Sequence, residues 1–310
     1  MVTCTKLQRA QKSIYEEEVA LKSSVGLAAI AALLTLTSSG MASETAHNHA
    51  EQVGDEVIAA QRAALAAAVE GGIFGPQSPR DISSMGGENT LDFADAPSYS
   101  TMNLCNIHFH EGAEHKGGEF TTYAGNGDGE GYGTGYLYDG ELSDAELTPI
   151  DYPVGKGEHS TLEPGDTIEI HYVHTTAKVS PGPTLGACLS EAVANPQLRV
   201  EAQVFVLVND DSAASLVDLT RIEQIAGFYQ AVTLPNSTGT PVVYDGSTTG
   251  PSYNAKASPL QVTWSVRPQV MKVSTKSVAE WLEDNVFDED HAHGVRNLVI
   301  APELLSPIAN

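Results

Sequence analysis

Basic residues are scarce in this sequence. Lys and Arg together number 16 against 40 Asp and Glu, which gives a formal net charge of -24. Nucleic acids and anionic membrane surfaces would repel such a chain, so neither is expected as a partner. No glycine-rich phosphate-binding motif follows a predicted strand and opens a helix, so a nucleotide cofactor is not indicated. We interpret the charge as an acidic, solubilising surface.

Aromatic residues are also few, at 6% of 310 residues, and cysteine occurs only three times. The hydrophobic fraction of 41% and the charged fraction of 18% are nevertheless ordinary for a soluble globular protein. Such a composition excludes disorder over most of the chain.

An apolar run lies close to the N-terminus. The sequence after Lys22 reads SSVGLAAIAALLTLTSSGMASE. Its length and its closing small residues are typical of a secretory signal rather than of a membrane span. We predict a signal peptide over residues 1–42, cleaved after Ala42, and a secreted or periplasmic mature chain without a membrane span. The acidic residues Glu16, Glu17 and Glu18 are unusual in a signal peptide, and an internal helix is the alternative.

The number of cysteines is consistent with export. Cys4 would be removed with the signal, which leaves Cys105 and Cys188. An even pair could form one disulfide in an oxidising compartment, and two buried free thiols are the alternative.

The rest of the chain begins with one segment whose pattern is helical, and the pattern after it is typical of strands. Residues Glu51 to Glu70 are rich in Ala, place apolar residues at helical spacing and end at two glycines. We therefore expect an N-terminal helical extension over residues 43–75, followed by one large domain over residues 76–310.

Short β-branched segments separated by Gly, Pro, Asn and Asp follow this helix. They are MNLCNIHFH, DTIEIHYVHT, LRVEAQVFVLVND, PVVYDG and LQVTWSVRP. They predict a mainly β, α+β fold with a central, mostly antiparallel twisted sheet and a few peripheral helices, including SVAEWLEDNVF near the C-terminus. The glycine-rich stretch from Gly125 to Gly140 lacks the ligand order of a calcium loop, and we expect a surface loop there.

Three of the ten histidines fall in the stretch NIHFHEGAEH. On a strand, Asn106, His108 and His110 would share one face, with Cys105, Ile107 and Phe109 on the other, because side chains alternate. Two imidazoles on one face can reach a single metal ion.

A second strand supplies the third imidazole. In TIEIHYVHT, Glu169, His171 and Val173 share one face and His174 lies on the other. His171 is the better ligand, because Glu169 can accept its second ring N–H and fix the tautomer. Three neutral imidazoles leave a fourth position open on Zn²⁺, which is the pattern of a catalytic zinc site.

These motifs resemble those of the carbonic anhydrases, specifically the delta class, which is similar to the alpha class. PQSPRDI, from Pro76 to Ile82, resembles the segment that opens alpha-type domains. DGSTTGP, from Asp245 to Pro251, resembles the loop beside the metal, although it lacks a Leu and has Gly250 in place of a Pro. The matches keep the order of the family from Gln77 to Arg267, with a looser similarity in AHGVRNLV.

The resemblance implies an alpha-carbonic-anhydrase-like fold and a lyase that hydrates carbon dioxide reversibly to bicarbonate and a proton. The attack would come from a zinc-bound hydroxide. The resemblance implies Zn²⁺ ligands at His108, His110 and His171. It also implies that Asn106 and Glu169 orient His108 and His171.

Further roles follow from the same resemblance. Glu114 would accept a hydrogen bond from a threonine, which is Thr248 or, one position later, Thr249. Val173, Val262 and Trp264 would line the carbon dioxide pocket, while His115 and His174 would be structural. No histidine lies between Gln52 and Ile107, where the alpha class has its proton shuttle, so the candidates for this role are His159, His291, His293 or a surface acid.

Two alternatives stay open. In a cupin-like oxygenase or isomerase, Glu114 would be a metal ligand beside His108 and His110, although the glycines of the first cupin motif are replaced here by Met102 and Thr121. A secreted, non-catalytic zinc-binding protein would keep the fold but would be expected to have lost a ligand.

Overall fold

The computed structural model describes residues 52–70, 72, 74–91, 93–157, 162–248 and 254–308. The predicted signal peptide over residues 1–42 lies outside these residues, as do Cys4, His159 and Thr249. Within the described ranges, no helix is both long enough and apolar enough to cross a membrane.

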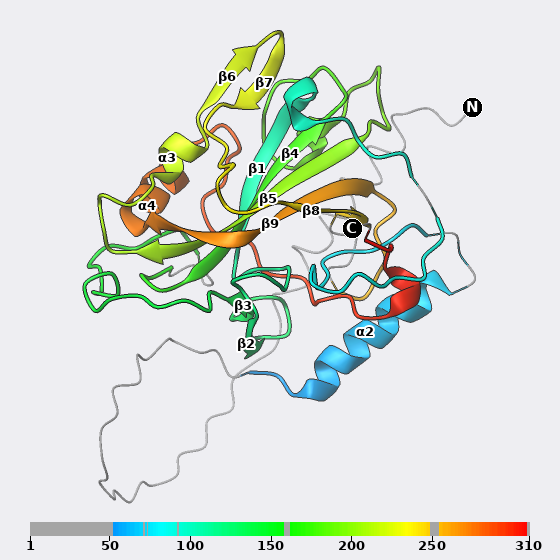
Figure 1. Ribbon diagram of the computed structural model, residues 1–310, viewed down its shortest axis with the longest axis horizontal. Coiled ribbons are helices and arrows are strands. Elements are labelled where there is room, and N and C mark those ends of the chain that lie inside the picture. Colours follow the sequence, from blue (N-terminus) through cyan, green and yellow to red (C-terminus); the bar gives the residue numbers. More distant parts are fainter. Residues whose placement is uncertain are drawn as a thin grey trace, which may run out of the picture. The chain divides into compact units, whose positions relative to one another are not determined.

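A five-stranded sheet forms the centre of the fold, in the order β1-β4-β5-β9-β8 (Figure 1). All neighbouring strands are antiparallel except β5 and β9, which are parallel. The strands are β1 (Asn103–Glu111), β4 (Thr167–Thr175), β5 (Leu198–Val208), β8 (Val242–Ser247) and β9 (Gln261–Ser274). They coincide with the five β-branched segments of the sequence, so the prediction of a mostly antiparallel sheet is confirmed.

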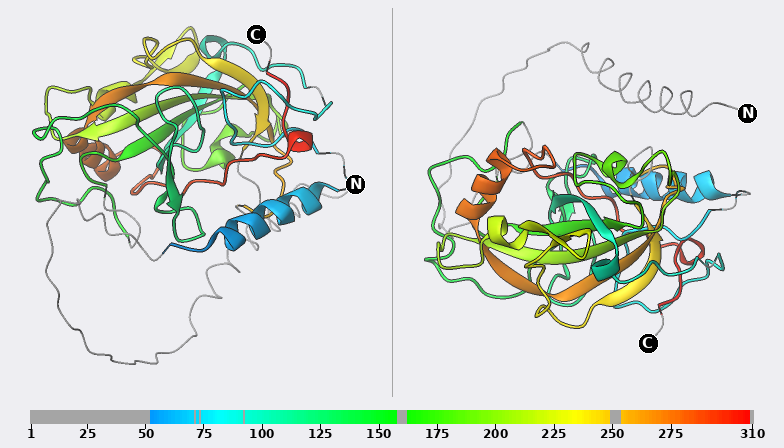
Figure 2. Two further views of the ribbon diagram at one scale, coloured as in Figure 1. Left: turned by 60° about the horizontal axis from the view of Figure 1, so that its bottom comes forward. Right: turned by 90° about the horizontal axis from the view of Figure 1, so that it is seen from above.

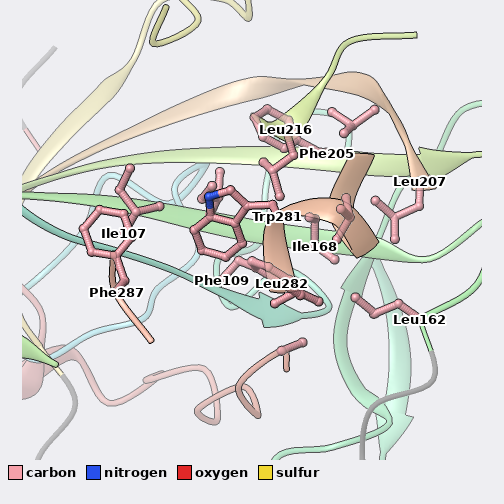
Figure 3. Close-up of a cluster of buried hydrophobic side chains, with 14 of the residues drawn as sticks. Ile107, Phe109, Leu162, Ile168, Phe205, Leu207, Leu216, Trp281, Leu282 and Phe287 are labelled. Atoms are coloured by element: carbon pink, nitrogen blue, oxygen red, sulfur yellow. The ribbon is translucent and has the colours of Figure 1, made fainter. Parts of the chain in front are cut away.

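Both faces of this sheet are covered, which explains why all nine residues of β4 are buried. One face carries a large hydrophobic cluster that includes Ile107, Phe109 and Phe205 (Figure 3). Helix α4 (Thr275–Glu283) places Trp281 in this cluster, with its ring 5.8 Å from that of Phe109. The histidines of β1 therefore lie on the opposite face.

A β-bulge interrupts β1 just before these histidines. Leu104 pairs with His174 and Asn106 pairs with Val173, so Cys105 is an extra residue in the ladder. Its side chain joins the cluster on the histidine side instead of the row of Ile107 and Phe109. The predicted alternation is thus wrong at Cys105. Of the two alternatives for the cysteine pair, the structure has the disulfide, because Cys105 is bonded to Cys188.

The predicted N-terminal helix is α2 (Asp55–Val69). Leu65 packs with Val299, Leu304 and Leu305, and Arg62 donates to the carbonyl oxygen of Leu298. Figure 2 accordingly shows α2 outside the sheet, beside the C-terminal segment.

The smaller elements lie around the sheet. The glycine-rich stretch, expected to be a surface loop, contains the end of β2 and the whole of β3. These two strands pair as an antiparallel hairpin. The elements are β2 (Thr122–Asn126), β3 (Thr134–Leu137), the hairpin β6 (Ile222–Ile225) and β7 (Phe228–Ala231), α3 (Leu216–Leu219), and the 3₁₀ turns η1 (Tyr99–Thr101), η2 (Leu185–Cys188) and η3 (Pro302–Leu304).

Candidate metal centre

Three histidines converge from β1 and β4. The register places His108 directly opposite His171, and His110 opposite Glu169. One ring nitrogen of each of His108, His110 and His171 lies within 4.8 Å of the others. Nε2 of His108 and Nδ1 of His171 are 3.3 Å apart. The pairing of β1 with β4, which is regular beyond the bulge at Cys105, therefore assembles the predicted set.

The outward nitrogen of each ring meets an oxygen acceptor. Nδ1 of His108 lies 2.7 Å from Oδ1 of Asn106, and Nδ1 of His110 lies 2.9 Å from the carbonyl oxygen of Gly294. Nε2 of His171 lies 2.8 Å from Oε1 of Glu169. Each ring donates its proton outward in these contacts, so the inward nitrogens present lone pairs to one another.

These lone pairs fit a divalent cation. With metal–nitrogen distances of about 2.0–2.1 Å, two ligands of a tetrahedral zinc ion stand roughly 3.3–3.4 Å apart, which matches the separation between His108 and His171. Burial, reinforced by His171 and His110, holds the pKa of His108 well below its usual 6.5, and burial lowers the pKa of His110 to about 4. Both rings are therefore neutral and able to coordinate a metal at neutral pH.

Glu169 connects His171 to a second imidazole, that of His115. Its Oε1 lies 2.6 Å from Nδ1 of His115, and its Oε2 accepts from the backbone N–H of the same residue at 3.0 Å. Burial by itself raises the pKa of Glu169, but His115 and His171 hold that pKa well below 4.5. Nε2 of His115 then meets the hydroxyl of Tyr244 at 2.6 Å. No spacing in the sequence links His115 or Tyr244 to this site.

A small cavity of about 30 Å³ adjoins the histidines. His108, His171, Glu114, Thr248, Val173 and Trp264 line it, together with Leu185 and Val200. The register aligns Val173, Val200 and Trp264 in one row across β4, β5 and β9, next to the row of His171. Val262 is not among the described residues that line this cavity. It lines a separate cavity instead, together with Phe93 and Gln261.

Glu114 and Thr248 both lie in the wall of the cavity. Oε1 of Glu114 accepts from the backbone N–H of Arg296 at 2.9 Å, and Nη1 of Arg296 donates to the carbonyl oxygen of Thr248 at 3.3 Å. Arg296 is buried and thus fastens the two predicted residues to the C-terminal segment. The sequence offers only the looser similarity around VRNLV as a signal for it. The hydrogen bond between Thr248 and Glu114 stays a prediction.

Two further histidines lie at the edge of the site. The ring of His293 is 5.6 Å from that of His108, and its Nε2 lies 2.6 Å from Oε2 of Glu289. The ring of His291 is 5.7 Å from that of His293. Of the histidine candidates for proton transfer that the structure describes, His293 lies beside His108 and His291 lies beside His293. His174 lies on the opposite face of the sheet, as predicted, with Nδ1 3.0 Å from the carbonyl oxygen of Tyr172.

The fold and the site define a mainly β protein in which three imidazoles that could hold a metal ion converge, two of them, His108 and His171, in the wall of a small cavity. A family model described as delta carbonic anhydrase matches residues 99–277, a range that contains all three histidines. The chain belongs to the delta carbonic anhydrase family, a family of enzymes. This membership removes the cupin alternative, and Glu114 is in neither of the two groups of potential metal ligands found among the described residues.

Comparison with curated protein sequences gives no match. Solved structures similar to this chain include a hyperthermostable carbonic anhydrase from an active hydrothermal vent chimney, at 16% identity and a TM-score of 0.27 over 73% of this chain and 86% of that one. The alpha-carbonic anhydrase of Photobacterium profundum has 16% identity and a TM-score of 0.26, over 79% and 95% of the two chains. A halotolerant carbonic anhydrase from Dunaliella salina has 15% identity and a TM-score of 0.28, over 75% and 86%.

Proposed function

We propose that this protein hydrates carbon dioxide reversibly to bicarbonate and a proton, with one Zn²⁺ held by His108, His110 and His171. The observation that carries the proposal is the convergence of three nitrogen lone pairs beside a cavity of about 30 Å³. That space holds about two water molecules or one small molecule of similar size.

Bound zinc would supply a positive charge that lowers the pKa of a coordinated water to about 7, the value known for carbonic anhydrases as a class. The protein contributes position and polarity. Asn106, Glu169 and the carbonyl oxygen of Gly294 fix the ligand tautomers.

The cavity wall suits the proposed substrate. Val173, Val200 and Trp264 present apolar surface to a molecule without net charge or dipole and keep bulk water away. In our proposal, the Thr248 hydroxyl donates a hydrogen bond to Glu114 and accepts a hydrogen bond from the O–H of the reacting water, without taking up its proton. This arrangement turns a lone pair of the water oxygen toward carbon dioxide.

The decisive measurement is stopped-flow hydration of carbon dioxide by protein with and without a chelator. His171→Ala should abolish both zinc binding and hydration. His174→Ala is the matched control, because His174 is buried on the same strand but faces the other way. It should retain zinc and activity. Full activity in a zinc-free preparation would overturn the proposal, and zinc binding without hydration would favour the non-catalytic alternative.

We also propose export of the mature chain by a signal peptide over residues 1–42, with residues 43–75 as a helical extension and 76–310 as the catalytic domain. The disulfide between Cys105 and Cys188 supports an oxidising compartment. N-terminal sequencing of the protein from its source should find Ser43 first, and a mature chain that begins at Met1 would contradict export.

A further inference from the structure

One wall of the cavity does not come from the sheet. Leu185 lines the cavity and packs, partly buried, against the hydrophobic cluster on the histidine side. It is the first residue of η2, in the segment that connects β4 to β5. Val173, Val200 and Trp264, by contrast, are fixed in strands.

Several contacts fasten this connecting segment to β1 and β4. Cys188 is bonded to Cys105, and the carbonyl oxygen of Cys188 accepts from the Thr175 hydroxyl at 2.8 Å. Before η2, the N–H of Gly182 donates to the carbonyl oxygen of Cys105 at 3.0 Å. Leu185 is thus held from both sides along the chain and cannot easily move away from the cavity.

The same segment is joined to the metal ligands by one side chain. Nδ2 of Asn106 donates to the carbonyl oxygen of Gly182 at 3.2 Å, while Oδ1 faces Nδ1 of His108. Thr184, at a backbone φ of 58°, accepts from the N–H of Gly186 through its Oγ1. A β-branched residue holds such a conformation only where its surroundings impose it, so the turn before Leu185 is firmly placed.

We propose that Leu185 is a specificity-determining residue: it limits the cavity to molecules the size of carbon dioxide and excludes bulkier carboxyl compounds. This inference rests on the proposed function for the identity of the small substrate. Removing three carbon atoms at Leu185 would enlarge the cavity on the side that the sheet does not define. The disulfide and the Gly182 contacts keep this wall in place.

The test compares acetate with benzoate, which share a metal-binding carboxylate but differ in bulk. Their dissociation constants would be measured calorimetrically on zinc-loaded protein, a readout independent of turnover. Leu185→Ala should shift the ratio of the two constants toward benzoate by roughly tenfold. Leu189→Ala, on the exposed residue just after the disulfide, should leave the ratio unchanged. An unchanged ratio in Leu185→Ala would overturn the inference.

A second experiment weakens the attachment of the segment that carries Leu185, without changing Leu185 itself. The double variant Cys105→Ala with Cys188→Ala should shift the ratio in the same direction, and a ratio equal to that of the wild type would show that the disulfide does not hold the wall. If this variant does not fold, the Leu185→Ala result decides alone. Carbon dioxide hydration is measured separately: a shifted ratio without any hydration would refute the proposed function and still support the wall.

Discussion

Replacing Glu169 with glutamine exchanges one carboxylate oxygen for an amide NH₂ group at the centre of the site. The carboxylate is fully buried and accepts three hydrogen bonds. Oε1 faces ring nitrogens of His115 and His171 at 2.6 and 2.8 Å, and Oε2 faces the backbone N–H of His115 at 3.0 Å. An amide has only one acceptor oxygen, so at least one of the three donors must face another donor.

The two possible orientations of the amide have different costs. If its nitrogen replaces Oε2, one buried N–H is left without an acceptor, which lowers the free energy of unfolding by about 1–3 kcal/mol. If the amide nitrogen replaces Oε1, it donates toward Nε2 of His171. The proton of His171 must then move to Nδ1, the nitrogen that would face the metal. Loss of a group that orients a ligand lowers metal affinity by about 10–100-fold, or ~1.4–2.7 kcal/mol, and the second orientation falls at the upper end.

Zinc affinity would be measured by competition with a chromophoric chelator, and stability by urea unfolding of the zinc-free protein. Glu201→Gln is the matched control, because Glu201 is a buried glutamate that pairs with Arg199 and lies opposite Tyr172, on the face away from the histidines. It should lose stability but keep its zinc affinity. If Glu169→Gln binds zinc within about twofold of the wild type, the orienting role of Glu169 is refuted.

Three further outcomes are expected. Removing the disulfide by Cys105→Ala with Cys188→Ala opens a loop with a sequence separation of 83, and chain entropy predicts a loss of ~4.6 kcal/mol in urea unfolding; a loss below about 1 kcal/mol would contradict it. Burial lowers the pKa of His174 from 6.5 to about 3, so the unfolded chain binds the extra proton between these values and stability falls as pH drops from 6.5 to 3. His174→Gln should remove up to ~1.4 kcal/mol per pH unit of that slope in zinc-free protein, and an unchanged slope would refute the assignment. Chelation of zinc present at 100 times its dissociation constant should lower the free energy of unfolding by about 2.7 kcal/mol, and equal stability with and without chelator would argue against a metal in the folded state.

Local sequence predicts the strands and the shared face of His108 and His110 well. All five strands of the sheet match β-branched segments, because an apolar run between turn residues is a local property. His108 and His110 share a face because side chains alternate along a strand, and the bulge at Cys105 lies before them and leaves this alternation intact. The bulge itself has no signal in the sequence, since it depends on how β1 pairs with β4.

The residues that surround the three histidines are harder to predict from the sequence. Asn106 and Glu169 lie two residues from the histidines they contact, so strand periodicity places them correctly. Arg296 and Tyr244 reach the site from segments far along the chain, and no periodicity relates those segments to β1. Packing between distant segments also decides that Val200 lines the cavity and that Val262 does not.

The sequence by itself determined the acidic charge, the five strands, the shared face of His108 and His110 and the pair of cysteines. Each of these follows from composition or from a period of two residues, which any strand imposes on its side chains. Only the tertiary structure decided the register that sets His108 opposite His171, the link from Glu169 to His115, and the closure of the cavity by Leu185. These features depend on packing between distant segments, and that packing is a property of the whole fold.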